Sequence, residues 1–227
     1  MKTMPHVFEP TLLWQKEEKL KLKGTWGERV ILELACGGGD YTVALAQREQ
    51  EQEQTALRAV VVGVDIKGSR MWWGAKKVAD LKLPNAKFLR TQIENLGDFF
   101  AEDEVDEIWI TFPNPHPTKG NAKRRLTSRR FLEIYKHILK PGGLLHLKTD
   151  DAALFAFSRE TLPLEGFTVE LALEDVYGAR KVDPLLTEVQ TQYEKKYLEQ
   201  GKAIKYLCFS MPSSPNPLAR PTVCLLS

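Results

Sequence analysis

The segment Val30-Ile-Leu-Glu-Leu-Ala-Cys-Gly-Gly-Gly39 decides the fold of this chain. Its first part, Val30–Leu34, is apolar apart from Glu33 and predicts a strand that is buried on both faces. Three glycines follow, and the residues after them, Tyr41–Arg48, predict a helix. Glycines at such a turn let the backbone bend tightly and approach a ligand closely. The segment therefore predicts the first strand, loop and helix of a ligand-binding α/β sheet.

Strand-like and helical segments alternate along the rest of the chain. We expect further strands at Val60–Asp65, Ala86–Leu89, Val105–Thr111, Leu144–Thr149, Thr168–Leu173 and Lys205–Phe209. We expect helices at Ser69–Ala79, Arg129–Leu139, Ala152–Leu162 and Glu188–Glu199. Apolar strands that alternate with helices are typical of a mostly parallel, doubly wound sheet. The order of the segments therefore predicts the α/β class with a Rossmann-like architecture.

The size and composition of the chain indicate one domain. It has 227 residues, of which 43% are hydrophobic, and this is enough to bury one substantial core. We expect the domain at residues 29–211, an N-terminal extension at residues 1–28 and a proline-rich C-terminal tail at residues 212–227. The net charge is only +2, so any affinity for nucleic acid must come from a local basic patch.

The cysteines and the N-terminal segment indicate the compartment. The three cysteines are odd in number and form no CxxC pair, which argues against a disulfide framework and a structural zinc site. The four histidines are scattered, so we expect no metal. Residues 1–10 do not resemble a signal peptide, and the longest aliphatic run, near residues 59–64, is too short to span a bilayer. These features predict a soluble cytoplasmic protein that does not bind a membrane.

A proline-rich loop follows the strand expected at Val105–Thr111. It reads Phe112-Pro-Asn-Pro-His-Pro117, and six cations come after it with no acidic residue between them: Lys119, Lys123, Arg124, Arg125, Arg129 and Arg130. Open α/β sheets bind ligands at the carboxyl ends of their strands, so a rigid polar loop in this position suits a substrate pocket. Cations beside such a pocket suit a substrate that carries phosphates. The alternative is a solvated loop that leads into a helix.

The glycine loop favours one class of cofactor over another. A dinucleotide site requires G-x-G-x-x-G, but Thr42 stands where the third glycine would be, which disfavours NAD. The loop instead resembles the acid-led E-x-x-x-G-x-G of S-adenosylmethionine-dependent methyltransferases, whose cofactor has no pyrophosphate to bind. Asp65 ends the next strand, where a carboxylate can accept two hydrogen bonds from ribose hydroxyls. These residues predict S-adenosyl-L-methionine as the cofactor.

Five motifs together resemble the bacterial tRNA (guanine-N7-)-methyltransferase family. They are ELACGGG from Glu33, VGVDIKG from Val62, ITFPNPHPTKGNAKRR from Ile110, LHLKTD from Leu145 and TQYEKKYLEQG from Thr191. They occur in the family's order and cover about residues 24–209. The resemblance implies a class I methyltransferase fold with an antiparallel C-terminal strand. It also implies methyl transfer from S-adenosyl-L-methionine to N7 of the variable-loop guanine of tRNA.

The resemblance assigns the cofactor contacts. It implies that the cofactor is held by Glu33, Gly37, Gly39, Asp65, Gln92 and Asn114. Gln92 stands where the family usually has an aspartate near the adenine, and its amide oxygen can still accept a hydrogen bond from the adenine amino group. Asn114 stands in Phe-Pro-Asn-Pro-His, where the family usually has Phe-Pro-Asp-Pro-Trp. It therefore occupies the position of an aspartate near the reaction centre and is the expected catalytic residue.

The resemblance also assigns the contacts with tRNA. It implies that the substrate guanine is bound by Thr118, Lys119, Asp150, Thr191, Gln192, Tyr193 and Glu194. The family usually has a lysine where this chain has Thr118, and the adjacent Lys119 can replace it. We expect the tRNA phosphates to be contacted by Lys123, Arg124, Arg125, Arg129 and Arg130, which set the register without reading sequence. tRNA is therefore the expected partner, bound by a monomer or a homodimer.

Asn114 is compatible with catalysis at guanine N7. This nitrogen has a lone pair and no proton, so it can attack a sulfonium methyl group without a general base. Catalysis then depends on holding N7 in line with the methyl group and on stabilising the cationic product. We expect the loss of the aspartate charge to cost about 1–3 kcal/mol, so that the enzyme is slower or re-tuned but active. The alternative is that Asn114 is only a turn residue.

Three aromatic side chains have two interpretations each. His116 either stacks on the target base or ribose, or packs the loop that contains it. Trp72 and Trp73 can stack on nucleobases, but we expect them on a helix face that is buried against the sheet.

Two other functions compete with guanine-N7 methylation. Asn114-Pro115, followed by the ring of His116, loosely resembles the Asn-Pro-Pro-Tyr loop of methyltransferases that act on exocyclic amines. The second proline and the tyrosine are missing, so this alternative ranks lower. The other alternative is a non-catalytic RNA-binding relative, with Asn114 and Gln92 as signs of lost activity. Identifying the methylated nucleoside distinguishes the first alternative from guanine-N7 methylation. Cofactor binding without turnover on any tRNA would support the second.

Overall fold

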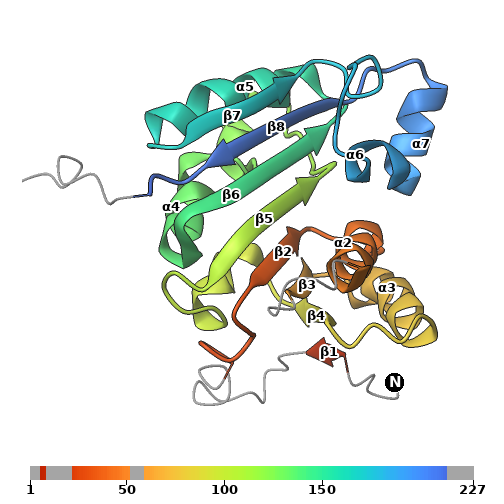
Figure 1. Ribbon diagram of the computed structural model, residues 1–227. Helices are drawn as coiled ribbons and strands as arrows, with labels where there is room; N and C mark the ends of the chain where they lie inside the picture. Colours follow the sequence, from red (N-terminus) through yellow and green to blue (C-terminus); the bar gives the residue numbers. More distant parts are fainter. Residues whose placement is uncertain (1–5, 9–21, 52–58, 214–227) are drawn as a thin grey trace, which may run out of the picture.

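The computed structural model describes residues 6–8, 22–51 and 59–213, which contain one eight-stranded sheet with helices against it (Figure 1). The order of the strands across the sheet is β1-β4-β3-β2-β5-β6-β8-β7. Their bounds are β1 Val7–Phe8, β2 Val30–Leu34, β3 Val60–Asp65, β4 Ala86–Arg90, β5 Val105–Thr111, β6 Leu139–Thr149, β7 Thr168–Leu173 and β8 Lys205–Ser210. Neighbours from β1 to β6 are parallel, whereas β8 is antiparallel to both β6 and β7. The predicted mostly parallel sheet with an antiparallel C-terminal strand is confirmed.

The order of the strands reverses between β2 and β5. From β2 the chain passes to β3 and β4 on one side, and then crosses to β5 and β6 on the other side. In the register of the sheet, Glu33 of β2 lies opposite Gly63 of β3 and Trp109 of β5. The loops that follow β2 and β5 therefore diverge, and in open α/β sheets this is where ligands bind. It is also the edge at which the sequence predicts the cofactor.

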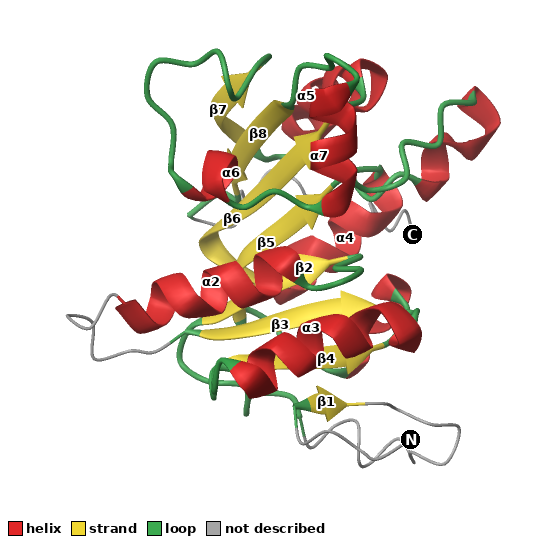
Figure 2. Ribbon diagram, turned by 90° about the vertical axis from the view of Figure 1, so that its right-hand side faces the viewer, coloured by secondary structure: helices red, strands yellow, loops and turns green. Residues whose placement is uncertain are grey.

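Helices cover both faces of the sheet (Figure 2). In the described part of the chain they are α2 Asp40–Glu51, α3 Gly68–Asp80, α4 Arg129–Ile138, α5 Ala152–Leu164, α6 Leu185–Glu188 and α7 Gln192–Glu199, with the 3₁₀ helices η1 Ile93–Asp98 and η2 Lys119–Arg124. One hydrophobic core contains Leu32 of β2 with Phe131 of α4. The other contains Ile31 of β2 with Leu186 of α6. Successive strand residues enter different cores because they point to opposite faces of the sheet. None of the helices in the described ranges is long and apolar enough to cross a membrane.

Several boundaries differ from the sequence prediction. The helix expected at Glu188–Glu199 begins only at Gln192, as α7, because Thr191 is extended and its hydroxyl accepts a hydrogen bond from the backbone N–H of Glu194. Such a cap starts a new helix. The short helix α6, which precedes it, is not predicted. β6 begins at Leu139 rather than Leu144, and β1, for which no strand is predicted, pairs with β4. Most of the predicted N-terminal extension, and the predicted tail from residue 214 onwards, lie outside the described residues.

The prediction that Trp72 and Trp73 pack against the sheet is wrong. Their exposed fractions are 38% and 60%. The residues of α3 that are buried against the sheet are Met71, Gly74, Ala75 and Val78. With about 3.6 residues per turn, this stripe places Trp73 on the opposite side of the helix and Trp72 on its flank. A helix in this position buries mainly small side chains because it lies close to the glycine loop.

The ring of Phe88 on β4 explains that close approach. A Cβ atom at Gly39 would lie 2.7 Å from this ring, one at Gly63 would lie 2.9 Å from it, and one at Gly74 would lie 2.5 Å from it. Non-bonded atoms in a close-packed interior do not approach to such distances, so all three positions require glycine. Gly39 also has a φ of +70°, which glycine adopts without strain. The glycine loop, β3 and α3 are thus packed together around one aromatic ring.

Candidate active site

A cavity of about 350 Å³ lies at the carboxyl ends of β2, β3, β4 and β5. Its size is within the range of small-molecule binding sites. It is lined by Ala35, Asp65, Ile66, Thr91, Gln92, Ile93, Glu94, Asn114, His116, Arg124, Leu126 and Phe131. The structure therefore brings together Asp65, Gln92 and Asn114, which the sequence assigns to the cofactor, with His116 and Arg124 from the segment after β5.

The Asp65 carboxylate holds the glycine loop against the end of β3. Its Oδ2 atom accepts a hydrogen bond from the backbone N–H of Gly37 at 2.9 Å, and its Oδ1 atom accepts one from the backbone N–H of Lys67 at 2.8 Å. Each carboxylate oxygen has a second lone pair, so both can still accept from a ligand hydroxyl. A Cβ atom at Gly37 or Gly38 would have no neighbour within 4 Å. The backbone of this loop therefore borders open space.

Glu33 lies behind the glycine loop and is buried. Its Oε2 atom accepts hydrogen bonds from the backbone N–H and the hydroxyl of Thr42, at 2.7 and 2.6 Å, and its Oε1 atom accepts one from the hydroxyl of Thr111 at 3.2 Å. Burial raises the pKa of Glu33 from 4.5 to about 7, although these hydrogen bonds act to lower it. The side chain is not part of the cavity lining. Its contacts fix the loop, and the cofactor contact predicted for it stays a prediction.

The loop after β5 has a strained backbone. Phe112 and His116 have φ angles of +48° and +44°, and Ala35 in the glycine loop has a φ of +56°. Non-glycine residues in this region persist only where neighbouring contacts hold them, and they cluster at functional sites. Asn114 supplies one such contact, because its Oδ1 atom accepts a hydrogen bond from the backbone N–H of His116 at 3.1 Å. The turn uses the side-chain oxygen of Asn114 and leaves its two amide hydrogens as donors.

Arg125 supplies the other contact that holds this loop. The residue is only 8% exposed. Its guanidinium group donates to the carbonyl oxygens of Pro115 and His116 at 3.2–3.3 Å, and lies 4.4 Å from the centre of the Phe157 ring. This buried, loop-holding position differs from the phosphate contact that the sequence predicts for Arg125. Partial burial, together with the positive charges of Arg124 and Arg125, lowers the pKa of His116.

The other cations of the segment are exposed. Arg129 and Arg130 pair with Glu165 and Glu94 at 3.5 and 3.3 Å. Because both arginines are exposed, these pairs are weak and can be exchanged for phosphates. Within the described ranges no acidic side chain forms an ion pair with the remaining exposed cations, which are Lys119, Lys123 and Arg124. The positive surface thus begins at the cavity itself, because Arg124 lines it.

A buried ion pair joins β6 to α7. Lys148 and Glu194 are fully buried, with 2.5 Å between Nζ and Oε1. The ammonium group also donates to the Tyr41 hydroxyl at 2.9 Å and to the Leu186 carbonyl at 2.6 Å, and the Tyr177 hydroxyl donates to Glu194 Oε1 at 2.9 Å. Burial raises the pKa of Glu194, and the Lys148 charge opposes this effect. Glu194 Oε2 is buried without a hydrogen-bond partner among the described residues, so this acceptor is not used by them.

The residues predicted to bind the guanine do not line the cavity. They are Thr118, Lys119, Asp150 and residues 191–194. Asp150 forms an ion pair with Lys202 at 2.6 Å, at the same edge of the sheet. The ring of Phe112 lies 6.0 Å from the ring of Tyr197 on α7. The loop of residues 112–117 therefore contacts α7 through Phe112 and lines the cavity through Asn114 and His116.

The sequence matches known methyltransferases over most of its length. A family described as "Putative methyltransferase" matches residues 27–207. A protein named tRNA (guanine-N(7)-)-methyltransferase from Porphyromonas gingivalis is 41% identical over 220 residues, which are 93% of this chain and 86% of the relative. Proteins of the same name from Christiangramia forsetii and Clostridium novyi are 39% and 32% identical, over 91% and 84% of this chain and 92% and 87% of theirs. This chain belongs to the tRNA (guanine-N7-)-methyltransferase family.

Solved structures of other methyltransferases have the same fold as this family member. A 16S rRNA (adenine(1408)-N(1))-methyltransferase from Catenulisporales acidiphilia has a TM-score of 0.61, over 90% of this chain and 94% of its own, at 17% identity. An aminoglycoside resistance methyltransferase has a TM-score of 0.54, over 87% of this chain and 95% of its own, at 18% identity. At such low identity the likeness concerns the fold alone. The predicted Rossmann-like methyltransferase fold is confirmed.

The cavity suits S-adenosyl-L-methionine, the cofactor of this methyltransferase family. Asp65 has lone pairs left for the ribose hydroxyls, and the open space beside Gly37 and Gly38 lets a ligand reach the loop backbone. Ile66 and Leu126 supply apolar surface for a flat ring system, and Gln92 supplies an amide at the same wall. An apolar lining with a few placed polar groups is typical of a cofactor site.

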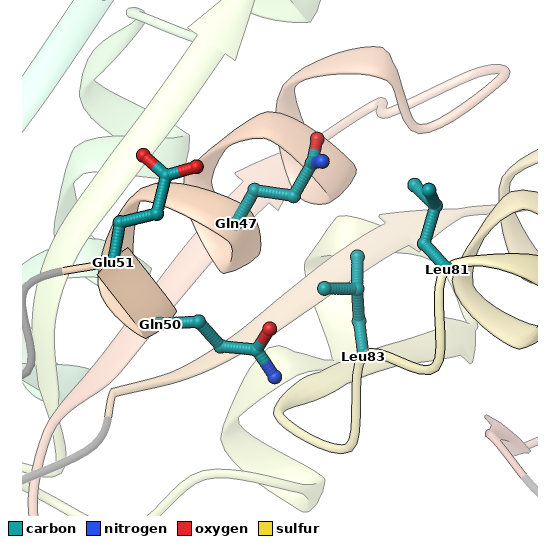
Figure 3. Close-up of a pocket in the computed structure, with 5 residues that line it drawn as sticks. All are labelled: Gln47, Gln50, Glu51, Leu81 and Leu83. Atoms are coloured by element: carbon teal, nitrogen blue, oxygen red, sulfur yellow. The ribbon is translucent and has the colours of Figure 1, made fainter.

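A second hollow, of about 400 Å³, lies at the other end of α2 (Figure 3). It is lined by Gln47, Gln50 and Glu51 of α2 and by Leu81 and Leu83, which follow α3. No residue predicted to be functional lies there. Among the described residues there is also no group of three His, Cys, Asp or Glu side chains that could hold a metal. The predicted site residues Asp65, Gln92 and Asn114 lie instead at the cavity at the carboxyl ends of the strands.

The buried Glu33 predicts a specific pH dependence of stability. Because the folded protein raises the pKa of Glu33 from 4.5 to about 7, the unfolded state loses this proton first as the pH rises. Glu33→Gln mimics the protonated side chain. We expect the free energy of unfolding of the wild type to fall by about 3 kcal/mol relative to that of the variant as the pH rises from below 4.5, and to level off about one unit above pH 7.

Urea unfolding of both proteins across this pH range measures the difference. Glu160→Gln is the matched control, since Glu160 is exposed on α5 and its removal tests the effect of one carboxyl group without burial. A difference between the wild type and Glu33→Gln that stays constant from pH 4.5 to pH 7 would contradict the raised pKa.

Proposed function

We propose that this protein transfers a methyl group from S-adenosyl-L-methionine to N7 of the variable-loop guanine of tRNA. The observation that carries the proposal is the cavity in which Asp65, Gln92 and Asn114 meet, in a chain 41% identical to a named tRNA (guanine-N(7)-)-methyltransferase over 93% of its length. The proposal is the same for a monomer and for a homodimer. We place the activity in the cytoplasm.

In this proposal the cofactor is bound by the wall of the cavity that β2, β3 and β4 form. Asp65 accepts hydrogen bonds from the ribose hydroxyls, Gln92 accepts one from the adenine amino group, and the backbone of Gly37 and Gly39 follows the cofactor closely. Glu33 contributes indirectly. Its carboxyl group accepts hydrogen bonds from the backbone N–H and the hydroxyl of Thr42, in the first turn of α2, and so holds the glycine loop in place. Bound S-adenosyl-L-methionine supplies an electrophilic methyl group on its sulfonium.

The residues around the cavity need to orient the guanine rather than deprotonate it. A bond forms between N7 and the methyl carbon as the carbon–sulfur bond breaks, and the positive charge passes from sulfur to the guanine ring. No proton leaves N7, so a general base is not required. What the chain supplies is a fixed position for N7 at near-attack distance, which can account for much of the rate. The strained loop of residues 112–117 is held rigidly by Arg125 and suits this task.

Asn114 and Glu194 take complementary parts in this proposal. The Asn114 side-chain oxygen is used in the turn, so its amide hydrogens face the guanine as donors to O6. Glu194 has one oxygen without a partner, which is the acceptor needed for the guanine N1–H and exocyclic amine. Thr191 fixes the start of the helix that carries Glu194. Thr118, Lys119, Asp150, Gln192 and Tyr193 complete the substrate side at the same edge of the sheet.

The exposed cations after the loop bind the tRNA backbone. Lys119, Lys123 and Arg124 have no acidic partner in the described ranges, and Arg129 and Arg130 can exchange theirs for phosphates. Such contacts set the register of the RNA and make the affinity depend on salt. Arg125 is left out of this set, because it holds the loop.

The proposal is tested by identifying the product. The purified protein is incubated with S-adenosyl-L-methionine and an unmodified tRNA transcript that has a guanine in the variable loop, and the digested nucleosides are identified by mass spectrometry. A parallel transcript carries adenine at that position. We expect 7-methylguanosine from the first transcript only. A methylated exocyclic amine would support the first alternative, and cofactor binding without any product would support a non-catalytic RNA-binding protein.

Restoring the carboxylate at residue 114 is expected to accelerate the reaction. Asn114→Asp keeps the acceptor that the backbone N–H of His116 requires, loses the amide donors to O6, and adds a negative charge beside the cationic product, which we expect to outweigh that loss. We expect kcat/KM for tRNA to rise about tenfold, which corresponds to about 1.4 kcal/mol. Asn114→Ala loses the turn and the donors, and is expected to lower kcat/KM. A rate of Asn114→Asp equal to or below the wild type would show that the asparagine is adapted to its own hydrogen-bond pattern.

Two neighbouring arginines are expected to differ in effect. Arg124→Gln removes an exposed charge, so we expect a higher KM for tRNA and a salt dependence of binding that is shallower by about one unit. Arg125→Gln removes the bonds to Pro115 and His116, so we expect kcat to fall by about ten- to a hundredfold with little change in the salt dependence. Steady-state kinetics at several salt concentrations measures both. Equal effects of the two substitutions would contradict the separate parts assigned to them.

A further inference from the structure

The two residues before α3 and the exposed side of α3 up to Lys76 carry an aromatic and cationic surface, of which only Ile66 also lines the cavity. Trp72 and Trp73 are 38% and 60% exposed, and Ile66, just before the helix, is 55% exposed. The two indole rings contact each other edge to face, with 4.9 Å between their centres. Large exposed aromatic side chains that lie together usually mark a binding surface. We call Ile66, Lys67, Arg70, Trp72, Trp73 and Lys76 the tryptophan patch.

The charge of the patch points to an anionic partner. From residue 66 to residue 79 the chain has four cations and no acidic residue. Lys77 pairs with Asp40 at 2.6 Å, but no acidic side chain in the described ranges pairs with Lys67, Arg70 or Lys76, all of which are exposed. Lys76 places its ammonium 5.8 Å from the centre of the Trp72 ring. Exposed aromatic rings interleaved with unpaired cations are the composition of single-stranded nucleic-acid surfaces, where bases stack and phosphates pair.

The patch is continuous with the cavity. Ile66 and Arg124 both line the cavity. α3 starts at the carboxyl edge of the sheet, because it begins at Gly68, three residues after β3 ends at Asp65. It lies along β3 and β4 (Figure 2). With a rise of about 1.5 Å per residue, Trp73 lies roughly 8 Å along the helix from its start. A single strand of RNA with one base in the cavity covers this distance with about two further nucleotides.

We propose that the tryptophan patch is a second RNA-binding surface, on which unpaired bases of the tRNA stack beside the target guanine. This inference rests on the proposed function for the identity of the RNA. The tRNA backbone then passes over the cavity between two cationic surfaces, with Lys119, Lys123 and Arg124 on one side and Lys67, Arg70 and Lys76 on the other. The bases next to the guanine leave their own stack when it enters the site, and Trp73 provides a replacement surface.

The test separates stacking from chemistry. Trp73→Ala is expected to raise the KM for tRNA about tenfold, the effect of losing one stacked base, with kcat at saturating tRNA unchanged. Trp73→Phe is expected to restore most of the affinity, because it keeps an aromatic face. The double variant Arg70→Gln/Lys76→Gln is expected to make the salt dependence of tRNA binding shallower by about two units. The Kd for S-adenosyl-L-methionine is expected to stay unchanged in all of them.

Leu164→Ala is the control, because Leu164 is 85% exposed at the end of α5 and outside the patch. Binding of labelled tRNA by fluorescence anisotropy is measured beside turnover. If the wild type makes no 7-methylguanosine, the proposed function fails, while anisotropy still decides whether RNA binds the patch. A Trp73→Ala protein with wild-type KM and Kd for tRNA would overturn the inference. A second result would also overturn it: the wild type is a dimer, and Trp73→Ala makes it a monomer without loss of tRNA affinity. The patch would then be the contact surface between two copies of this chain.

Discussion

A buried carboxyl group at the end of β2 fixes the three elements on which the cavity depends. Glu33 contacts Thr42 at the beginning of α2 and Thr111 at the end of β5, so one side chain sets the distance between the glycine loop and the loop that carries Asn114. Burial would make a free carboxylate costly at this position, and three donors offset that cost. Glu33, the acidic residue that begins the glycine motif, thus holds the backbone in place where the order of the strands reverses. Asp65 is the carboxylate that lines the cavity.

The loop after β5 is the second place where the fold holds a conformation that the sequence alone does not favour. Phe112 and His116 both have positive φ angles, and they are kept there by Asn114, by Arg125 and by the packing of Phe112 beside α7. The same α7 contains Glu194, which is bound to Lys148 inside the protein. In the proposed reaction, the position of the reactive edge of the guanine therefore depends on contacts between β5, β6 and α7, which are distant in the chain.

Hydrophobic runs, glycines and prolines predict the strands β2 to β8 and the helices α2 to α5 and α7, because they report local structure directly, but they miss β1 and α6. The motifs were sufficient to name Asp65, Gln92 and Asn114, which do lie together. Exposure was harder to predict. Trp73 is exposed because the small residues of α3 take the sheet-facing stripe, and Arg125 is buried within a segment of otherwise exposed cations. Tertiary contacts bring Lys148, Tyr41 and Tyr177 together around Glu194. The one feature of the sequence that indicates this cluster is a lysine inside an apolar strand.

The contacts of Phe88 have a consequence for how such enzymes can be altered. Gly39, Gly63 and Gly74 belong to a loop, a strand and a helix, yet each is limited by the same ring. Phe88 and these three glycines are therefore coupled, because a side chain at any of the three positions requires the ring to shrink or move. A cofactor loop transplanted from another methyltransferase into this scaffold would have to bring its own partner for residue 88. Shrinking that ring alone would not open the three positions to side chains, because a Cβ atom at Gly63 would still lie 2.5 Å from Thr42 Oγ1, one at Gly74 would lie 2.7 Å from the Gly38 carbonyl oxygen, and Gly39 has a φ of +70°.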